Sequence, residues 1–169
     1  MRAVCYLASL QYVIHRDVAS SNFLVTRRSQ PVVKLADFGR ARYVYDDDYE
    51  ADQSEMMTVK WSSPEVLASS HYSTKSDVWA AGVVMWEIMT LGQRPYSSLS
   101  AEQTAVYVLN GGRLSQPSEC PRGLYSAMAA CWRHRPSDRP TAAQLADIIR
   151  DDEPLTSHDS LRQTLQLTS

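Results

Sequence analysis

A polar stretch near the start of the sequence carries side chains that could act together on a phosphate. Residues 15–22 read His-Arg-Asp-Val-Ala-Ser-Ser-Asn and lie between an apolar, helix-like run and a β-branched strand. A carboxylate can accept a proton, and a carboxamide oxygen can bind a divalent cation. Asp17 and Asn22, five positions apart in one loop, could therefore serve one metal-bound phosphate, with Asp17 taking a proton and Asn22 holding the cation.

A second acidic side chain follows at a fixed distance. Asp37 stands fifteen residues beyond Asn22, and Phe38 and Gly39 come directly after it. This group offers an acid for a metal, an aromatic ring for packing and a glycine that lets the backbone change direction. Asp and Asn also favour turns for backbone reasons alone, and that simpler explanation applies to each of them singly. Their combination in this order favours an active site.

Composition removes some classes of function. The chain has 169 residues, with 17 basic and 19 acidic side chains and a formal net charge of -2, so nothing favours nucleic acid or an anionic membrane as a partner. Three cysteines without metal-binding or redox spacing are typical of buried thiols in a reducing, cytoplasmic setting. No apolar run approaches the ~20 residues of a membrane span, so no transmembrane segment is expected.

The polar loop needs a scaffold, and the apolar pattern predicts one that is mainly helical. The segment 77–90 is apolar on all sides, which predicts a helix buried at the centre of the domain. A capping box, Thr141-x-x-Gln144, marks the start of a last amphipathic helix. The remaining segments with helical spacing are residues 3–11, 101–110 and 124–132.

The other segments are predicted as a hairpin, a long loop and a tail. Residues 23–26 and 32–35 are apolar and flank a polar turn, which predicts a short β-hairpin leading into Asp37. Residues 40–62 are polar and lack periodicity, so we interpret them as a long functional loop. From residue 151 to 169 the chain is polar and weakly patterned, which is typical of a frayed tail.

The order of these motifs resembles that of the eukaryotic protein kinases. The loop at 15–22 matches H-R-D-L-x-x-x-N with Val18 in place of Leu, and Asp37 opens the D-F-G motif. Ser63-Pro64-Glu65 stands where the family has A-P-E. Three further segments resemble those of tyrosine kinases: the run 37–49, Val59-Lys60-Trp61, and the closing residues 131–141. The run 37–49 resembles the Tec-type cytoplasmic tyrosine kinases in particular.

The resemblance covers about residues 3–150 and implies only half of a catalytic domain. Residues 1–150 would form the C-terminal lobe of a Tec- or Src-like cytoplasmic tyrosine kinase, mainly α with a short β-hairpin, and 151–169 its polar tail. The sequence contains no G-x-G-x-x-G loop and no V-A-I-K strand. The N-terminal lobe that closes over ATP is therefore expected to be missing from this chain, and an apolar surface to be left uncovered.

The resemblance also implies catalytic and binding roles. Asp17 would accept the proton of a tyrosine hydroxyl on a protein substrate as the γ-phosphoryl of ATP is transferred. Asn22 and Asp37 would bind Mg²⁺, and Leu24 would contact the nucleotide. Arg16, counted with Asp17 and Asn22 among the catalytic residues, would pair with a phosphorylated residue of the activation loop.

Phosphorylation and structural roles follow from the same resemblance. Tyr49 is the main candidate for phosphorylation; the acidic residues before it either mark it for a kinase or are simply a solvated loop. His15 and Phe38 would pack together and so join the loop at 15–22 to the D-F-G motif. Gly39 would let the backbone change direction there. Asp77 would anchor the catalytic loop through its backbone, although its position also suits a helix cap. Glu65 and Arg139, the remaining structural residues, are predicted to form a buried ion pair.

The chain departs from the tyrosine kinase pattern at two places, and the first of them, together with the missing lobe, supports an alternative function. Tyrosine kinases usually carry an arginine two or four residues after the catalytic Asp, and this chain has Ala19 and Ser21 there. Thr58 stands where tyrosine kinases commonly have Pro. A cation near the transferred phosphoryl group would offset its charge. The alternative is therefore a non-catalytic, kinase-like scaffold, and the chain by itself is expected to be inactive as a kinase.

Overall fold

The computed structural model of the chain describes residues 6, 13–27, 29, 31–43, 48–50 and 58–151. For residues 48–50 and 151 the description covers the backbone only. The helix predicted at 3–11 lies outside the described residues, except Tyr6, which is helical. The tail predicted at 151–169 also lies outside them, except Asp151, where the last helix ends.

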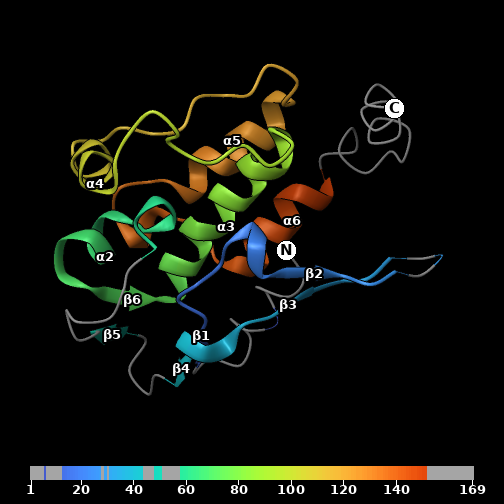
Figure 1. Cartoon of the computed structure of the whole chain (residues 1–169), viewed down its shortest axis with the longest axis horizontal. Helices are drawn as coiled ribbons and strands as arrows, with labels where there is room; N and C mark the ends of the chain where they lie inside the picture. Colours follow the sequence, from blue (N-terminus) through green and yellow to red (C-terminus); the bar gives the residue numbers. More distant parts are fainter. Residues whose placement is uncertain are drawn as a thin grey trace.

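The fold is arranged around one buried helix, α3 (Thr74–Met89), which runs through the centre of Figure 1. Every residue from Ser76 to Glu87 is buried, as the apolar pattern predicts. The helix begins earlier than predicted because the Ser73 side chain caps it in a capping box with Ser76. It ends where Gly92, at a φ of 88°, donates its N–H to the Glu87 carbonyl over 2.8 Å.

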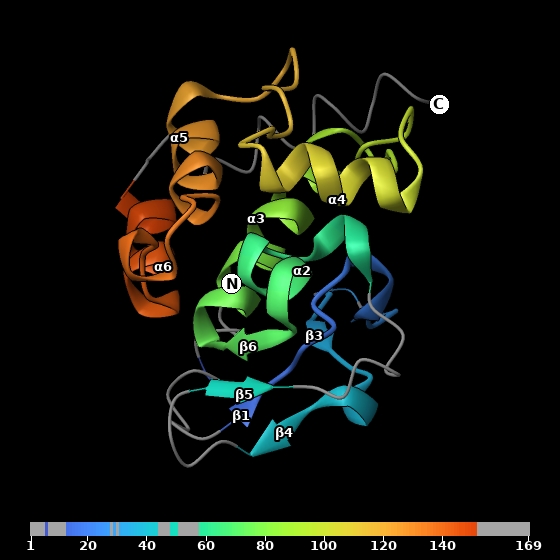
Figure 2. The ribbon, with the colours of Figure 1, turned by 90° about the vertical axis from the view of Figure 1, so that its left-hand side faces the viewer.

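Further helices surround α3, as the two ribbon views show (Figures 1 and 2). Gly82 of α3 allows the closest approach, because a Cβ there would lie 2.7 Å from the Trp132 Nε1 and 2.8 Å from the Cys131 Cβ. The capping box at Thr141 is present, with the Gln144 N–H donating to the Thr141 Oγ1 over 3.1 Å. The surrounding helices are α2 (Pro64–Ser69), α4 (Ala101–Leu109), α5 (Arg122–Cys131) and α6 (Ala142–Asp151).

The strands within the described residues form three separate antiparallel pairs. The predicted hairpin is confirmed: β2 (Phe23–Val25) pairs with β3 (Val33–Leu35). The other pairs join distant segments: β1 (Val13–Ile14) with β4 (Arg42–Tyr43), and β5 (Asp48–Glu50) with β6 (His71–Ser73). The interpretation of residues 40–62 as one loop is therefore wrong at β4, at β5 and at the 3₁₀ turn Val59–Trp61. Strands this short show no alternation in the sequence, because their pairing partners are far along the chain.

The predicted ion pair between Glu65 and Arg139 is present and joins α2 to the segment before α6. Two contacts of 2.7 Å link the guanidinium to the carboxylate, and the Arg139 side chain is fully buried. The other N–H groups of Arg139 donate to the carbonyls of Lys75, Arg133 and His134. All five N–H donors of the guanidinium therefore have acceptors, which is the condition for burying this charge.

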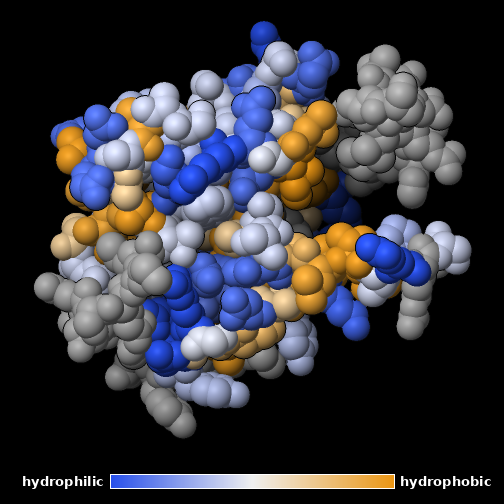
Figure 3. Space-filling view, viewed as in Figure 1, coloured by the Kyte–Doolittle hydropathy of each residue, from blue (hydrophilic) through white to orange (hydrophobic). Residues whose placement is uncertain are grey.

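Exposed apolar side chains gather on the β2–β3 hairpin, where Figure 3 shows hydrophobic colour on the arm that projects from the body. A groove of 570 Å³ lies between this hairpin, α3 and α6, and its lining is mostly apolar. None of the described helices is long and apolar enough to cross a membrane. The exposed apolar residues of the hairpin are Leu24, Val25, Val32 and Val33.

Replacing Arg139 with alanine should destabilise the fold severely. The change removes the guanidinium from the Glu65 carboxylate and one donor from each of three backbone carbonyls, which costs about 3–5 kcal/mol. Urea unfolding followed by circular dichroism would measure the change. Arg135→Ala is the control, because Arg135 is exposed and should change the free energy of unfolding by less than about 0.5 kcal/mol. Equal stability of the two variants would contradict the role given to Arg139.

The ion pair should also make stability depend on pH. Burial acts to raise the pKa of Glu65, but the hydrogen bonds and charge of Arg139 outweigh burial and hold the pKa below its ordinary value of 4.5. The folded state then binds fewer protons than the unfolded state, so this stabilisation is complete above pH 4.5 and is lost as the pH falls through the folded pKa. The difference in unfolding free energy between wild type and Glu65→Gln should therefore shrink below pH 4.5. A difference in unfolding free energy that stays constant down to pH 3 would count against this role of the Glu65–Arg139 ion pair.

Candidate active site

The loop at residues 15–22 is fixed to α3 by one buried carboxylate. The Asp77 side chain accepts the His15 N–H at Oδ2 over 2.7 Å and the Arg16 N–H at Oδ1 over 3.0 Å. Arg16 has a φ of 67°, a left-handed conformation that is unfavourable for arginine and that these two bonds help to hold. Burial raises the pKa of the Asp77 carboxyl, and the two N–H donors limit that rise. Asp77 thus lies where the predicted anchor of the loop should be.

The His15 ring connects this loop to residues 36–39. Its Nδ1 accepts the Asp17 N–H over 3.3 Å, so the ring proton is on Nε2, which donates to the Ala36 carbonyl over 3.1 Å. The ring also packs against Phe38, edge to face, with 4.8 Å between the ring centroids. His15 and Phe38 are in contact, as the resemblance implies.

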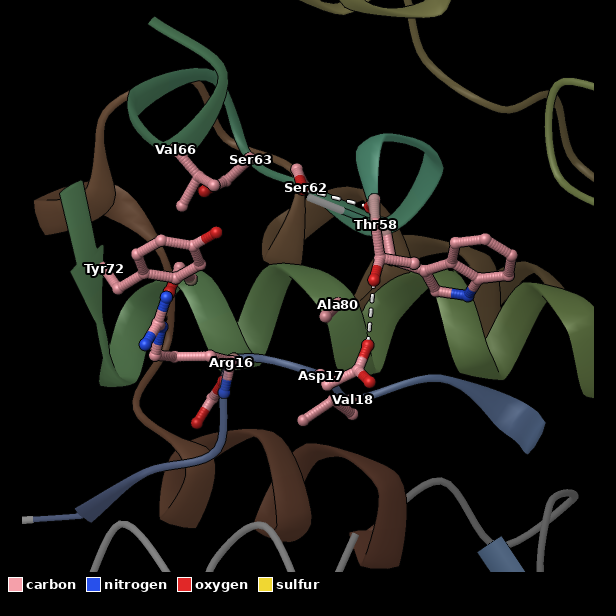
Figure 4. Close-up of a pocket in the computed structure, with 12 residues that line it drawn as sticks. Arg16, Asp17, Val18, Thr58, Ser62, Ser63, Val66, Tyr72 and Ala80 are labelled. Atoms are coloured by element: carbon pink, nitrogen blue, oxygen red, sulfur yellow. Dashed lines mark hydrogen bonds between the residues drawn. The ribbon is translucent and has the colours of Figure 1, made fainter. Parts of the chain in front are cut away.

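Asp17 lies at the open side of the loop, beneath Thr58 (Figure 4). Its Oδ1 accepts the Thr58 hydroxyl over 2.9 Å, and the Arg40 Nη1 lies 3.8 Å from the same oxygen. Arg40 also donates to the Thr58 Oγ1 over 3.0 Å. Within the described residues the Oδ2 makes no hydrogen bond, which leaves it able to accept a proton from a bound hydroxyl.

Asn22 and Asp37 offer oxygen atoms that suit Mg²⁺. The Asn22 Nδ2 donates to the Asp17 carbonyl over 2.7 Å, which leaves the Asn22 Oδ1 for a cation. The Ala36 N–H donates to the Asn22 carbonyl over 2.8 Å and brings the next residue, Asp37, beside the same loop. Asp37 is exposed, has a φ of 61° and accepts the Gly39 N–H over 3.4 Å.

This donor set fits magnesium better than a transition metal. Among the described residues no group of three or more His, Cys, Asp or Glu could hold a metal ion. Mg²⁺ needs only one or two protein oxygens, because water and substrate phosphates complete its coordination. Asn22 and Asp37 together supply such a set.

The side chains of two other predicted residues, Leu24 and Arg16, have different surroundings. Leu24 lies on β2, 60% exposed, with Lys34 as its partner across the hairpin. The Arg16 guanidinium lies 4.4 Å from the centre of the Tyr72 ring and donates to the Arg40 carbonyl over 3.3 Å. Tyr72 is the β6 partner of Tyr49, whose side chain lies outside the described residues. Arg16 and the backbone of Tyr49 therefore both adjoin Tyr72.

Sequence reasoning did not identify Glu87 or Arg40. Glu87 is buried in α3 and accepts the Ser20 hydroxyl over 2.7 Å and the Trp61 indole N–H over 2.9 Å, so it ties the loop to the Val59–Trp61 turn. An acid within the apolar run that follows Asp77 in this helix was the signal for it. For Arg40 the signal was a cation placed directly after the D-F-G motif.

Comparison with known proteins identifies the family of the chain. Residues 1–149 match the family model for protein tyrosine and serine/threonine kinases. The chain is 44% identical over 148 residues to the tyrosine-protein kinase Btk of Drosophila melanogaster, an alignment that covers 88% of this chain and 18% of the relative. It is 43% identical over 156 residues to the cytoplasmic tyrosine-protein kinase BMX of Mus musculus, covering 92% and 23%.

Receptor proteins are also similar to the chain. The insulin receptor of Xenopus laevis is 40% identical over 150 residues, covering 88% of this chain and 11% of the receptor. The chain thus spans between 11% and 23% of the length of these three relatives. The family model and the identities over most of the chain agree, and the chain belongs to the protein tyrosine and serine/threonine kinase family.

Proposed function

We propose that residues 1–150 are the C-terminal lobe of a protein tyrosine kinase catalytic domain, whose complete protein transfers the γ-phosphoryl of ATP to tyrosine. The observation that carries this proposal is the position of Asp17. Its carboxylate is held by Thr58 in a loop anchored to Asp77, beside the oxygen donors Asn22 and Asp37. The similarity to proteins named tyrosine-protein kinases supports tyrosine as the acceptor.

In this mechanism the residues of the chain position groups and move one proton. Bound ATP and Mg²⁺ supply the phosphoryl group and the charge that offsets its negative oxygens. Asp17 orients the tyrosine hydroxyl and accepts its proton as the new O–P bond forms and the bond to ADP breaks. Asn22 and Asp37 hold the metal, and Thr58 keeps the Asp17 carboxylate in place.

A second lobe is required to cover ATP. The sequence has no glycine-rich phosphate loop and no V-A-I-K lysine, and it spans only a fraction of its relatives. We therefore propose an N-terminal lobe as its partner, placed over the exposed face of the hairpin where Leu24 would contact the nucleotide. The printed name of the relative BMX supports a cytoplasmic location.

One observation favours a second candidate function. Ala19 is buried and Ser21 exposed, so neither position supplies the cation that tyrosine kinases usually carry in this loop. A chain with this defect could serve as a kinase-like scaffold that binds other proteins without transferring phosphate. The two functions differ in whether the complete protein turns over ATP.

Asp17→Asn in the complete protein should abolish most phosphate transfer without unfolding it. An amide cannot accept the proton but can still accept the Thr58 hydrogen bond, so kcat should fall by about 10²- to 10⁴-fold while the thermal midpoint stays unchanged. Transfer of ³²P from labelled ATP to a tyrosine polymer would measure the loss. Wild-type transfer that Asp17→Asn leaves intact would refute Asp17 as the base, and a wild type that binds Mg-ATP without transfer would favour the scaffold.

Phosphorylation of Tyr49 should raise the activity of the complete protein. The Tyr49 backbone pairs with Tyr72, against whose ring the Arg16 guanidinium lies, and we expect one or two charge-assisted hydrogen bonds from Arg16 to a phosphate on Tyr49 to order the segment. We expect preincubation with Mg-ATP to increase the rate about tenfold in wild type and not in Tyr49→Phe. Tyr45→Phe is the matched control and should still be activated. Activation that survives in Tyr49→Phe would exclude this site.

A further inference from the structure

The Asp17 carboxylate has a cation beside it that comes from outside its own loop. The Arg40 Nη1 lies 3.8 Å from the Asp17 Oδ1. Among the residues that the structure describes, each of the two is the other's single ion-pair partner. The Arg40 side chain is 35% exposed and the Asp17 side chain 17%, so water screens this pair less than a pair on the open surface. The charge of Arg40 therefore acts on the group that we propose as the base.

Thr58 connects these two side chains. The Arg40 Nη1 donates to the Thr58 Oγ1 over 3.0 Å, and the Thr58 hydroxyl donates to the Asp17 Oδ1 over 2.9 Å, the bond that Figure 4 draws. Both hydrogen bonds point the same way, from the cation through the hydroxyl to the carboxylate, so each strengthens the other. The proline that tyrosine kinases commonly have at this position has no hydroxyl and could not make the connection.

Contacts with the loop at residues 15–22 hold the backbone of Arg40 in place. Phe38 begins the 3₁₀ turn Phe38–Arg40 and packs against the His15 ring. The Arg16 Nη1 donates to the Arg40 carbonyl over 3.3 Å. Both contacts start from the loop that also carries Asp17, so the cation and the carboxylate are fixed to the same part of the fold.

We propose that Arg40, acting through Thr58 and Asp17, supplies the positive charge that tyrosine kinases usually carry within the catalytic loop itself. The inference rests on the proposed function, because it takes Asp17 as the base. During transfer the tyrosine hydroxyl gives its proton to Asp17, its oxygen bonds to the γ-phosphorus, and the bond to ADP breaks. Arg40 keeps its protons throughout, because a guanidinium stays charged, so it is a positioning residue whose charge holds the carboxylate and offsets negative charge at the site.

The inference accounts for two departures of this chain together. Ala19 and Ser21 leave the loop without the arginine that tyrosine kinases usually have there, and Thr58 stands where they commonly have proline. The first departure removes a cation from the loop. The second adds the hydroxyl that connects Asp17 to Arg40, and so offsets the first.

The kinetic test uses the complete protein, saturating Mg-ATP and a synthetic peptide with one tyrosine. Arg40→Gln should lower kcat about 10- to 100-fold, because a fixed charge that acts in the transfer is lost, and leave KM for the peptide within about twofold. Arg135→Gln removes the same charge at an exposed position and should keep the wild-type kcat. Arg40→Lys keeps the charge but not the planar guanidinium, and should lose less than Arg40→Gln.

A second substitution tests whether the charge itself matters. Ser21 is exposed, so a longer side chain there does not disturb the core. Ser21→Arg, added to Arg40→Gln, should raise kcat at least about fivefold, because it returns a cation to the loop. Ser21→Gln is the uncharged match and should leave kcat where Arg40→Gln put it. A purely structural role of Arg40 would not be repaired by a charge on another segment.

A further readout does not depend on activity. In the 169-residue chain with ¹⁵N-labelled arginine, nuclear magnetic resonance distinguishes a guanidinium held by hydrogen bonds from one that rotates freely. The Arg40 Nη signals, assigned by their absence in Arg40→Gln, should show slow rotation in wild type. Thr58→Val keeps the shape of the side chain but removes its hydroxyl, and should release the rotation.

The outcomes separate this inference from the alternatives. A held Arg40 guanidinium, a loss confined to kcat and its recovery by Ser21→Arg support it. A freely rotating guanidinium, a wild-type kcat in Arg40→Gln, a loss in KM alone or no recovery by Ser21→Arg overturns it. A faster Arg40→Gln also overturns it, because Arg40 would then block Asp17. These results leave the proposed function standing, whereas a complete wild-type protein that transfers no phosphate overturns both.

Discussion

A buried carboxylate in the first turn of α3 is the constraint on which the rest of the site depends. Asp77 cannot remain in the core without hydrogen-bond donors, and its donors are the backbone N–H groups of His15 and Arg16. Their segment is therefore drawn onto the central helix from 61 and 62 residues away in the sequence. Asp17 and Asn22 follow in the same loop, so this attachment helps to position both of them.

Two further acids, one buried and one half-buried, extend the same principle. The buried one, Glu87, lies near the other end of α3, accepts hydrogen bonds from Ser20 and Trp61, and so brings the loop and the Val59–Trp61 turn together. Glu65 accepts the Arg139 guanidinium and joins α2 to the segment before α6. Asp77 and Glu87 therefore hold two points of the same loop against α3, while Glu65 holds a different part of the fold.

The loop at residues 15–22 has no cation at Ala19 or Ser21, and the neighbours of Asp17 come from another segment. Thr58 donates to Asp17 and accepts from Arg40, so a hydroxyl and a guanidinium lie beside the Asp17 carboxylate. Both neighbours come from the segment after the D-F-G motif. The electrostatics at Asp17 therefore depend on how that segment lies, which links the state of the segment to the chemistry of the loop.

Local patterns in the sequence determined which side chains belong to the candidate site and which segments form the hairpin and the buried helix. The spacing of Asp17, Asn22 and Asp37, the hairpin and the buried helix are visible in short windows, because periodicity and turn chemistry act between near neighbours. Only the tertiary structure decided that β4 and β5 are strands, that Glu87 joins the loop, and that Thr58 and Arg40 adjoin Asp17. These contacts join residues 18 to 67 positions apart, and a side chain that meets its partner only after folding leaves no local trace in the sequence.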